Sequence, residues 1–135
     1  MIAQIRGRLI QKEPGSVVVE ANGLGYQVYV SLTTFYGLPE LEQTVILHTH
    51  THVREDVLQL FGFSFPLEKE LFQILIGVTG IGPKLALNIL SGITPEELLR
   101  SLDQRDMNKL QSVPGIGRRM AERMVVDLQE KARKI

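Results

Sequence analysis

The segment Gly-Ile-Gly occurs twice in this chain and constrains its C-terminal half more than any other feature. It lies within VTGIGPKLALNIL, residues 78–90, and within VPGIGRRMAERMV, residues 113–125, so every matching residue is shifted by 35 positions. Glycines flanking one residue favour a tight turn, and the residues that follow have the spacing of an apolar helix face. We therefore expect the same device, two helices joined by a glycine turn, to be built twice.

A glycine turn directly before a helix is suited to bind an anion. The helix N-terminus has unpaired N–H groups and a partial positive charge, and glycine lacks the side chain that would keep a phosphate away. In both copies a cation, Lys84 or Arg119, stands two residues after the second glycine. We expect the turns to hold two phosphates without reading bases. The amides would come from Gly80, Gly82, Gly115 and Gly117.

The repeated segment also has a purely structural interpretation. Gly-Ile-Gly can make a compact turn between packed helices while Ile81 and Ile116 fill the core. One copy would favour neither interpretation, whereas two copies with a cation at the same offset favour the anion site.

Two other glycine patterns do not fit nucleotide-binding motifs. Gly77 and Gly82 have the glycine spacing of a P-loop, but Pro83 stands where that loop requires its lysine. Gly23 and Gly25 lack the third glycine of a dinucleotide-binding loop, because its position is Val28. We do not expect this chain to be an ATPase by itself.

The N-terminal half alternates between apolar and polar residues, as strands do. About five short strands are expected, separated by turn signals at Pro14-Gly15, Asn22-Gly23 and Gly37-Leu38-Pro39. The strand candidates are residues 1–11, 16–21, 25–32, 44–53 and 57–63. Such a set predicts a small barrel or sandwich, of which the oligonucleotide/oligosaccharide-binding (OB) barrel is one type.

After Phe63 the apolar spacing becomes helical. Helices are expected to begin at Pro66 and Pro83, the second ending near Ser91, and Thr94–Glu97 forms a capping box before another. The first helix would bury Leu67, Leu71, Ile74, Leu75 and Val78, and the last Ala121, Met124, Val125 and Leu128.

Composition indicates a globular protein and gives only weak support for a nucleic-acid partner. With 135 residues, 44% of them hydrophobic, the chain can form one domain or two small ones, and it has no cysteine for disulfides or thiolate sites. No apolar run approaches the roughly 20 residues of a membrane span, so we expect a soluble, cytoplasmic protein. Residues 1–63 have 4 Lys/Arg and 6 Asp/Glu, net −2, and residues 64–135 have 11 and 9, net +2.

Several segments together resemble the RuvA family of bacterial Holliday-junction recognition proteins, over the whole chain. They are TGIGPK, PGIGRR, THVREDVLQLFGF, FYGLPE and GPKLALNILSG. The resemblance implies an α+β fold, with a five-stranded OB-fold barrel in residues 1–63 and an all-α tandem helix-hairpin-helix domain in residues 64–135.

The resemblance also implies a function and a set of DNA-binding residues. A non-catalytic subunit without cofactor or metal would hold four-way junctions open and square, supporting branch migration in recombination and repair. The hairpin glycines would hold the backbones of the arms, together with Lys84, Arg118, Arg119 and Arg123.

Glu55 and Asp56 would form the family's acidic pin at the centre of a homotetramer, where their charge would repel the phosphates at the crossover. From the residues alone, Arg54-Glu55-Asp56 is more typical of an ordinary solvated turn between strands.

The partners implied by the resemblance are the RuvB ATPase, which would supply ATP chemistry, and the RuvC resolvase. The family pattern continues through a linker into a third helical domain that engages RuvB, whereas this chain stops at KARKI. We therefore expect this chain to bind junctions and to form a tetramer, but not to stimulate RuvB. Whether a second tetramer closes over the DNA to form an octamer stays an open alternative.

Other residues allow functional interpretations that we consider weaker. His48, His50 and His52 share one strand face with a spacing that a metal could use, but a solvated or stacked face is more common. Tyr26, Tyr29, Phe61 and Phe63 could stack bases, although such residues are more often core. An enzyme that positions duplex for cleavage and a binder of single strands remain alternatives.

Overall fold

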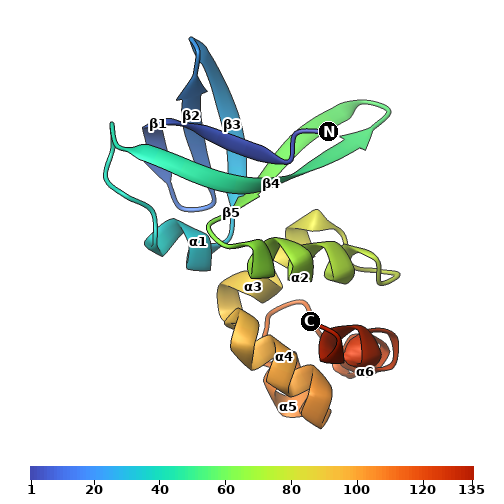
Figure 1. Cartoon of the computed structure of the whole chain (residues 1–135). Helices are drawn as coiled ribbons and strands as arrows, with labels where there is room; N and C mark the ends of the chain where they lie inside the picture. The colour runs from blue at the N-terminus through green and yellow to red at the C-terminus, as the bar shows by residue number, and fades with distance from the viewer. The chain divides into compact units, whose positions relative to one another are not determined.

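The computed structural model describes residues 1–135, which form two compact units, Met1–Lys69 and Glu70–Ile135. The first contains a closed barrel and the second is helical (Figure 1). This arrangement confirms the predicted α+β class.

Five strands form the barrel: β1 (Gln4–Glu13), β2 (Ser16–Ala21), β3 (Leu24–Val30), β4 (Thr44–Arg54) and β5 (Val57–Phe63). Their order around the barrel is β1-β2-β3-β5-β4, with β3 and β5 parallel and all other neighbours antiparallel. The prediction of a five-stranded, OB-like barrel is therefore confirmed.

Alternation along each strand fills the barrel, because every second side chain points inward. Asn22 and Gly23 have φ angles of 52° and 86° in the two-residue turn between β2 and β3, where positive values suit a hairpin. The buried core includes Leu9, Val17, Val19, Val28, Val30, Leu47 and Leu60.

Strands β4 and β5 extend beyond the rest of the barrel as a two-stranded arm (Figure 1). β4 pairs with β1 only as far as His48, and β5 pairs with β3 only from Leu60 to Gly62. Beyond these positions β4 and β5 pair with each other up to the facing residues Arg54 and Val57, and Thr49 and Thr51 of β4 also form hydrogen bonds with Ile2 and Ala3 before β1. The turn of the arm is thereby carried away from the barrel wall.

Helix α1 (Leu32–Tyr36) was not predicted, and the expectation of a strand through Leu32 was wrong. Ser31 ends the extended segment and caps the helix, its Oγ accepting a hydrogen bond from the Thr34 N–H at 3.1 Å. The hydroxyls of Ser31 and Thr34 both donate to the buried carboxylate of Glu68, with Ser31 Oγ 2.6 Å from Oε2. Burial raises the pKa of Glu68, although these hydrogen bonds act in the opposite direction.

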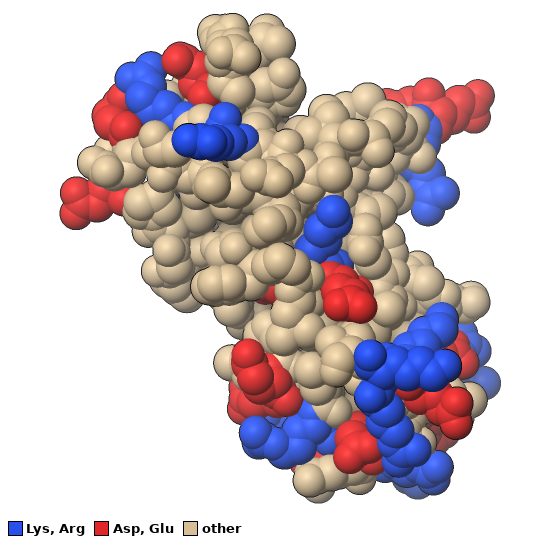
Figure 2. All heavy atoms as spheres, in the orientation of Figure 1, with Lys and Arg blue, Asp and Glu red and all other residues tan.

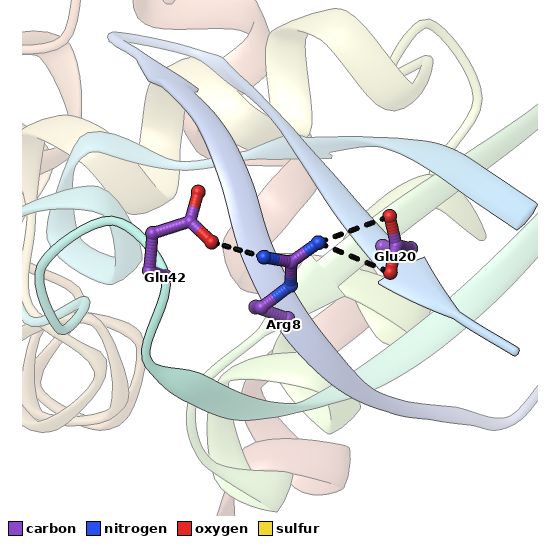
Figure 3. Close-up of polar contacts among 3 residues, drawn as sticks. All are labelled: Arg8, Glu20 and Glu42. Carbon is purple, nitrogen blue, oxygen red and sulfur yellow. Dashed lines mark hydrogen bonds and ion pairs between the residues drawn. The ribbon is translucent and has the colours of Figure 1, made fainter. Parts of the chain in front are cut away.

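Arg8 on β1 connects three segments on the outside of the barrel (Figure 3). Its Nη2 lies 3.2 Å from both carboxylate oxygens of Glu20 on β2, and its Nη1 pairs with Glu42, which precedes β4. The hydrogen bond to Glu20 is the main cause that raises the pKa of Arg8. Because Arg8 is already paired with two carboxylates, it is a poor candidate for a phosphate ligand.

The helices are α2 (Pro66–Ile76), α3 (Pro83–Gly92), α4 (Pro95–Gln104), α5 (Met107–Gln111) and α6 (Arg118–Arg133). The predicted capping box is present at α4, where Thr94 and Glu97 exchange two hydrogen bonds of 3.1 Å. The four residues expected to be buried on the last helix are buried on α6. Helix α3 ends at Gly92, one residue after the predicted end near Ser91.

Candidate nucleic-acid interface

The two Gly-Ile-Gly segments form turns with the same hydrogen bonds. In the first hairpin, residues 78–82, the Ile81 N–H donates to the Val78 carbonyl at 3.0 Å; in the second, residues 113–117, Ile116 donates to Val113 at 3.1 Å. Ile81 and Ile116 are both buried. The structural interpretation of these isoleucines is therefore confirmed, and it leaves the glycines to be explained.

The first glycine of each hairpin is required by the fold. Gly80 and Gly115 have φ angles of +96° and +97°, which side chains rarely adopt. A Cβ on Gly80 would lie 2.8 Å from Cε of Met120, and one on Gly115 would lie 3.2 Å from Cδ1 of Leu85. Since Leu85 and Met120 are also 35 positions apart, the hairpins pack against each other reciprocally.

The second glycine of each hairpin has no such structural reason. Gly82 and Gly117 are N-caps of α3 and α6 with φ angles of −93° and −91°, values open to any residue. A Cβ at either position would meet nothing within 4 Å. Neither N-cap has the side-chain hydrogen bond that Ser, Thr, Asn or Asp would supply.

The N–H groups of the hairpin glycines are available to a ligand. No hydrogen bond within the protein uses the N–H of Gly80, Gly82, Gly115 or Gly117. The start of each following helix adds unpaired N–H groups and a partial positive charge. Each hairpin therefore presents unbonded backbone donors on exposed glycines, with open space in front of the second glycine, which is the arrangement an anionic oxygen needs.

The four predicted basic residues differ in how they are engaged. Lys84 and Arg119 are exposed and have no protein partner. Arg118 forms an ion pair with Glu122 one turn later, at 3.2 Å, and Arg123 donates from Nη1 to the Thr79 carbonyl at 3.2 Å. Figure 2 shows Lys and Arg side chains gathered on the helical unit, with acidic side chains among them. Lys84 and Arg119 are thus the cations free to meet a phosphate at the hairpins.

Glu55 and Asp56 form the turn at the end of the β4–β5 arm, and both are exposed. Acidic side chains stand at this tip in Figure 2. Behind them Val53 and Leu58 face each other across the arm and are 47% and 66% exposed.

The three histidines of β4 and the tyrosines Tyr26 and Tyr29 are half-buried. His48, His50 and His52 face β5, and the ring of His52 meets Phe61 edge-on with centroids 6.2 Å apart. Burial is the main cause that lowers the pKa of His50, followed by the nearby His52. Phe61 and Phe63 are buried, and Tyr29 lies against Phe61.

Sequence reasoning missed the hydrogen bond between Arg123 and Thr79. No pattern indicates it, because these residues are far apart in the chain and the bond depends on how the two repeats pack. The buried carboxylate of Glu68 was also missed, since its position is typical of an ordinary charged residue in the first turn of a helix.

None of the helices has the length and apolar character needed to cross a membrane.

Comparisons with known proteins match both parts of the chain. Residues 1–62 match the family model "RuvA N terminal domain", and residues 72–130 match "SAM-like Helix-hairpin-helix tandem". Over all 135 residues the chain is 51% identical to a Holliday junction branch migration complex subunit RuvA from Geobacter sulfurreducens and 50% identical to one from Pelobacter propionicus, covering 68% of each. A protein of the same name from Halorhodospira halophila is 53% identical over 131 residues, which are 97% of this chain and 64% of that protein. The chain thus spans about two thirds of the length of these relatives.

Proposed function

Because the chain belongs to the RuvA family, we propose that it binds four-way DNA junctions through their backbone phosphates and holds them open for branch migration. It acts as a non-catalytic subunit in the cytoplasm, in recombination and DNA repair. The tandem helix-hairpin-helix domain of residues 64–135 binds the DNA, and the barrel of residues 1–63 carries the acidic turn.

The observation that carries this proposal is the pair of glycines at Gly82 and Gly117. Neither the backbone conformation nor neighbouring atoms require glycine there. A phosphate that approaches the exposed N–H groups at both hairpins would require it, because a Cβ would stand in the way. Lys84 and Arg119, two residues later and exposed, would pair with the same phosphates. Gly80, Gly115, Arg118 and Arg123 complete the DNA-binding surface.

Such contacts suit recognition by shape. Backbone amides and cations contact phosphates and sugars, which fixes the position of a strand but reads no base. Two reciprocal hairpins in one domain present two such sites at a fixed spacing. A multimer of these domains would grip several arms at once, and only a branched DNA offers arms in that arrangement.

The acidic turn of Glu55 and Asp56 would repel DNA phosphates, whereas the two hairpins would attract them. In a homotetramer the carboxylates of Glu55 and Asp56 would meet near the crossover and repel the converging phosphates, holding the strands apart. The partners in this proposal are the RuvB ATPase, which would drive migration, and the RuvC resolvase.

The dependence of junction binding on salt tests this proposal. Wild type, Lys84→Met and Arg119→Met would be titrated at several salt concentrations with two junctions of unrelated sequence. Each variant should bind both junctions more weakly, with the slope of log K against log salt reduced by about one for each lost phosphate contact. Slopes unchanged in both variants would remove these residues from the DNA surface.

A further inference from the structure

The two hairpins share a backbone but are held by different side chains. In the second hairpin Pro114 fixes its own φ angle, and just before the hairpin the Ser112 Oγ donates to the Lys109 carbonyl at 2.5 Å. The first hairpin has Thr79 and Gly77 at the positions 35 residues earlier. It therefore lacks both local restraints.

The first hairpin is restrained from the other repeat instead. Arg123, on the second turn of α6, donates from Nη1 to the carbonyl of Thr79 at 3.2 Å. The residue 35 positions before Arg123 is Asn88, and it makes no corresponding bond to Pro114. Only the second repeat thus holds the hairpin of the other repeat with a side chain, and the hairpin that it holds is the one without proline.

The place of this bond connects it to ligand binding. Thr79 directly precedes Gly80, whose φ angle is +96°. Holding the Thr79 carbonyl limits rotation at the peptide bond that carries the Gly80 N–H. The same side chain lies one turn after Arg119, which has no partner in the protein.

We propose that Arg123 is a positioning residue for DNA binding: it holds the first hairpin in its binding conformation, in the role that Pro114 has in the second, and is not itself a phosphate ligand. This inference rests on the proposed function, since it assigns the role of one residue within that surface. It separates Arg123 from Arg119, which the sequence places on the same helix face.

The free protein provides the first test, without DNA. In Arg123→Met, amide hydrogen exchange should become faster at Ile81, whose N–H closes the first hairpin, and stay unchanged at Ile116, whose N–H closes the second. Ile116 is thus an internal control within the same molecule. Unchanged exchange at Ile81 would overturn the proposal, whatever the protein binds.

A rescue variant provides the second test. Thr79→Pro gives the first hairpin the residue that the second has, and the Thr79 N–H makes no hydrogen bond that proline would remove. In the Arg123→Met background this change should slow the exchange of Ile81 again and restore junction affinity. A proline cannot replace a lost phosphate contact, so failure to restore affinity would identify Arg123 as a ligand.

Salt dependence completes the distinction. Arg123→Met should bind a four-way junction about three- to tenfold more weakly, from loss of one hydrogen bond per subunit, with a salt slope close to that of wild type. Arg119→Met is the matched control and should lower the slope. An equal fall in slope for both variants would contradict the positioning role. A wild-type protein without salt-dependent binding would refute the proposed function instead, while the exchange data would still decide whether Arg123 holds the hairpin.

Discussion

Replacing the hairpin glycines one at a time separates what the fold needs from what the ligand needs. Gly82 and Gly117 have ordinary φ angles and open space in front of them. Because both residues are N-caps, where glycine is preferred over alanine, each alanine should lower the free energy of unfolding by about 1 kcal/mol or less, and the protein should stay folded. The same change should strongly weaken junction binding, because the added methyl groups occupy the space through which a phosphate reaches the N–H groups.

The size of the binding effect follows from the contact that is lost. A hydrogen bond to a charged group contributes about 1.5–3 kcal/mol, so the loss at each hairpin corresponds to about a tenfold or larger decrease in affinity. Gly80→Ala is the matched control, because it should act on the fold. Its φ of +96° costs an L-residue about 1–2 kcal/mol, and the methyl group would also displace the flexible end of Met120, whose Cε would lie 2.8 Å away. That variant should lose several degrees of melting temperature.

Thermal unfolding and titration of a labelled four-way junction measure the two effects on the same samples. The reasoning predicts a folded Gly82→Ala/Gly117→Ala protein that binds poorly, and a Gly80→Ala protein whose loss of stability comes from a single substitution. Wild-type affinity in the folded double variant would refute it, because the open space at the N-caps would then not be where phosphate binds.

Two further predictions concern acidic residues. The hydrogen bond that the Thr94 N–H donates to the Glu97 carboxylate, with a smaller effect from Lys109, lowers the pKa of Glu97 from 4.5 to about 2. The stability that the ionised Glu97 contributes should therefore be complete above pH 4.5 and be lost as the pH falls through about 2. In acid unfolding, Glu97→Gln should lack this loss of stability at low pH. A variant whose stability has the same pH dependence as wild type would contradict this role of Glu97. Neutralising Glu55 and Asp56 together should keep or raise junction affinity, with a difference from wild type that shrinks as salt is added, since the Debye length is roughly 8 Å at physiological ionic strength. A large loss of binding in gel-shift titrations would rule out the repulsive role.

Local pattern was sufficient to predict much of the fold. Strands β4 and β5 follow the alternation of apolar residues, and the capping box at Thr94 marks the start of α4, because both signals depend on neighbours in the chain. Helix α1 was missed because Ser31 continues the alternation of the preceding strand. Its capping role became evident only from the backbone and from the carboxylate of Glu68, a residue distant in sequence.

In the candidate site, too, the sequence predicted what depends on local spacing and missed what depends on tertiary packing. The repeat predicted both hairpins and the cations at Lys84 and Arg119, because spacing alone relates them. It did not indicate that Gly80 is required by the fold whereas Gly82 is not, since that difference depends on φ angles and on the position of Met120 in the other repeat. The bond from Arg123 to Thr79 depends on the same packing, so residues with similar spacing and charge have different roles.

The most direct test of junction recognition is competitive gel-shift binding of this chain to an immobile four-way junction, with linear duplex and single strand of matched length and sequence as competitors. The account predicts that neither competitor displaces the junction at concentrations where unlabelled junction does. Equal competition by duplex would contradict recognition of the junction and reduce the hairpins to a general phosphate clamp, and stronger competition by single strand would favour the barrel as the binding surface.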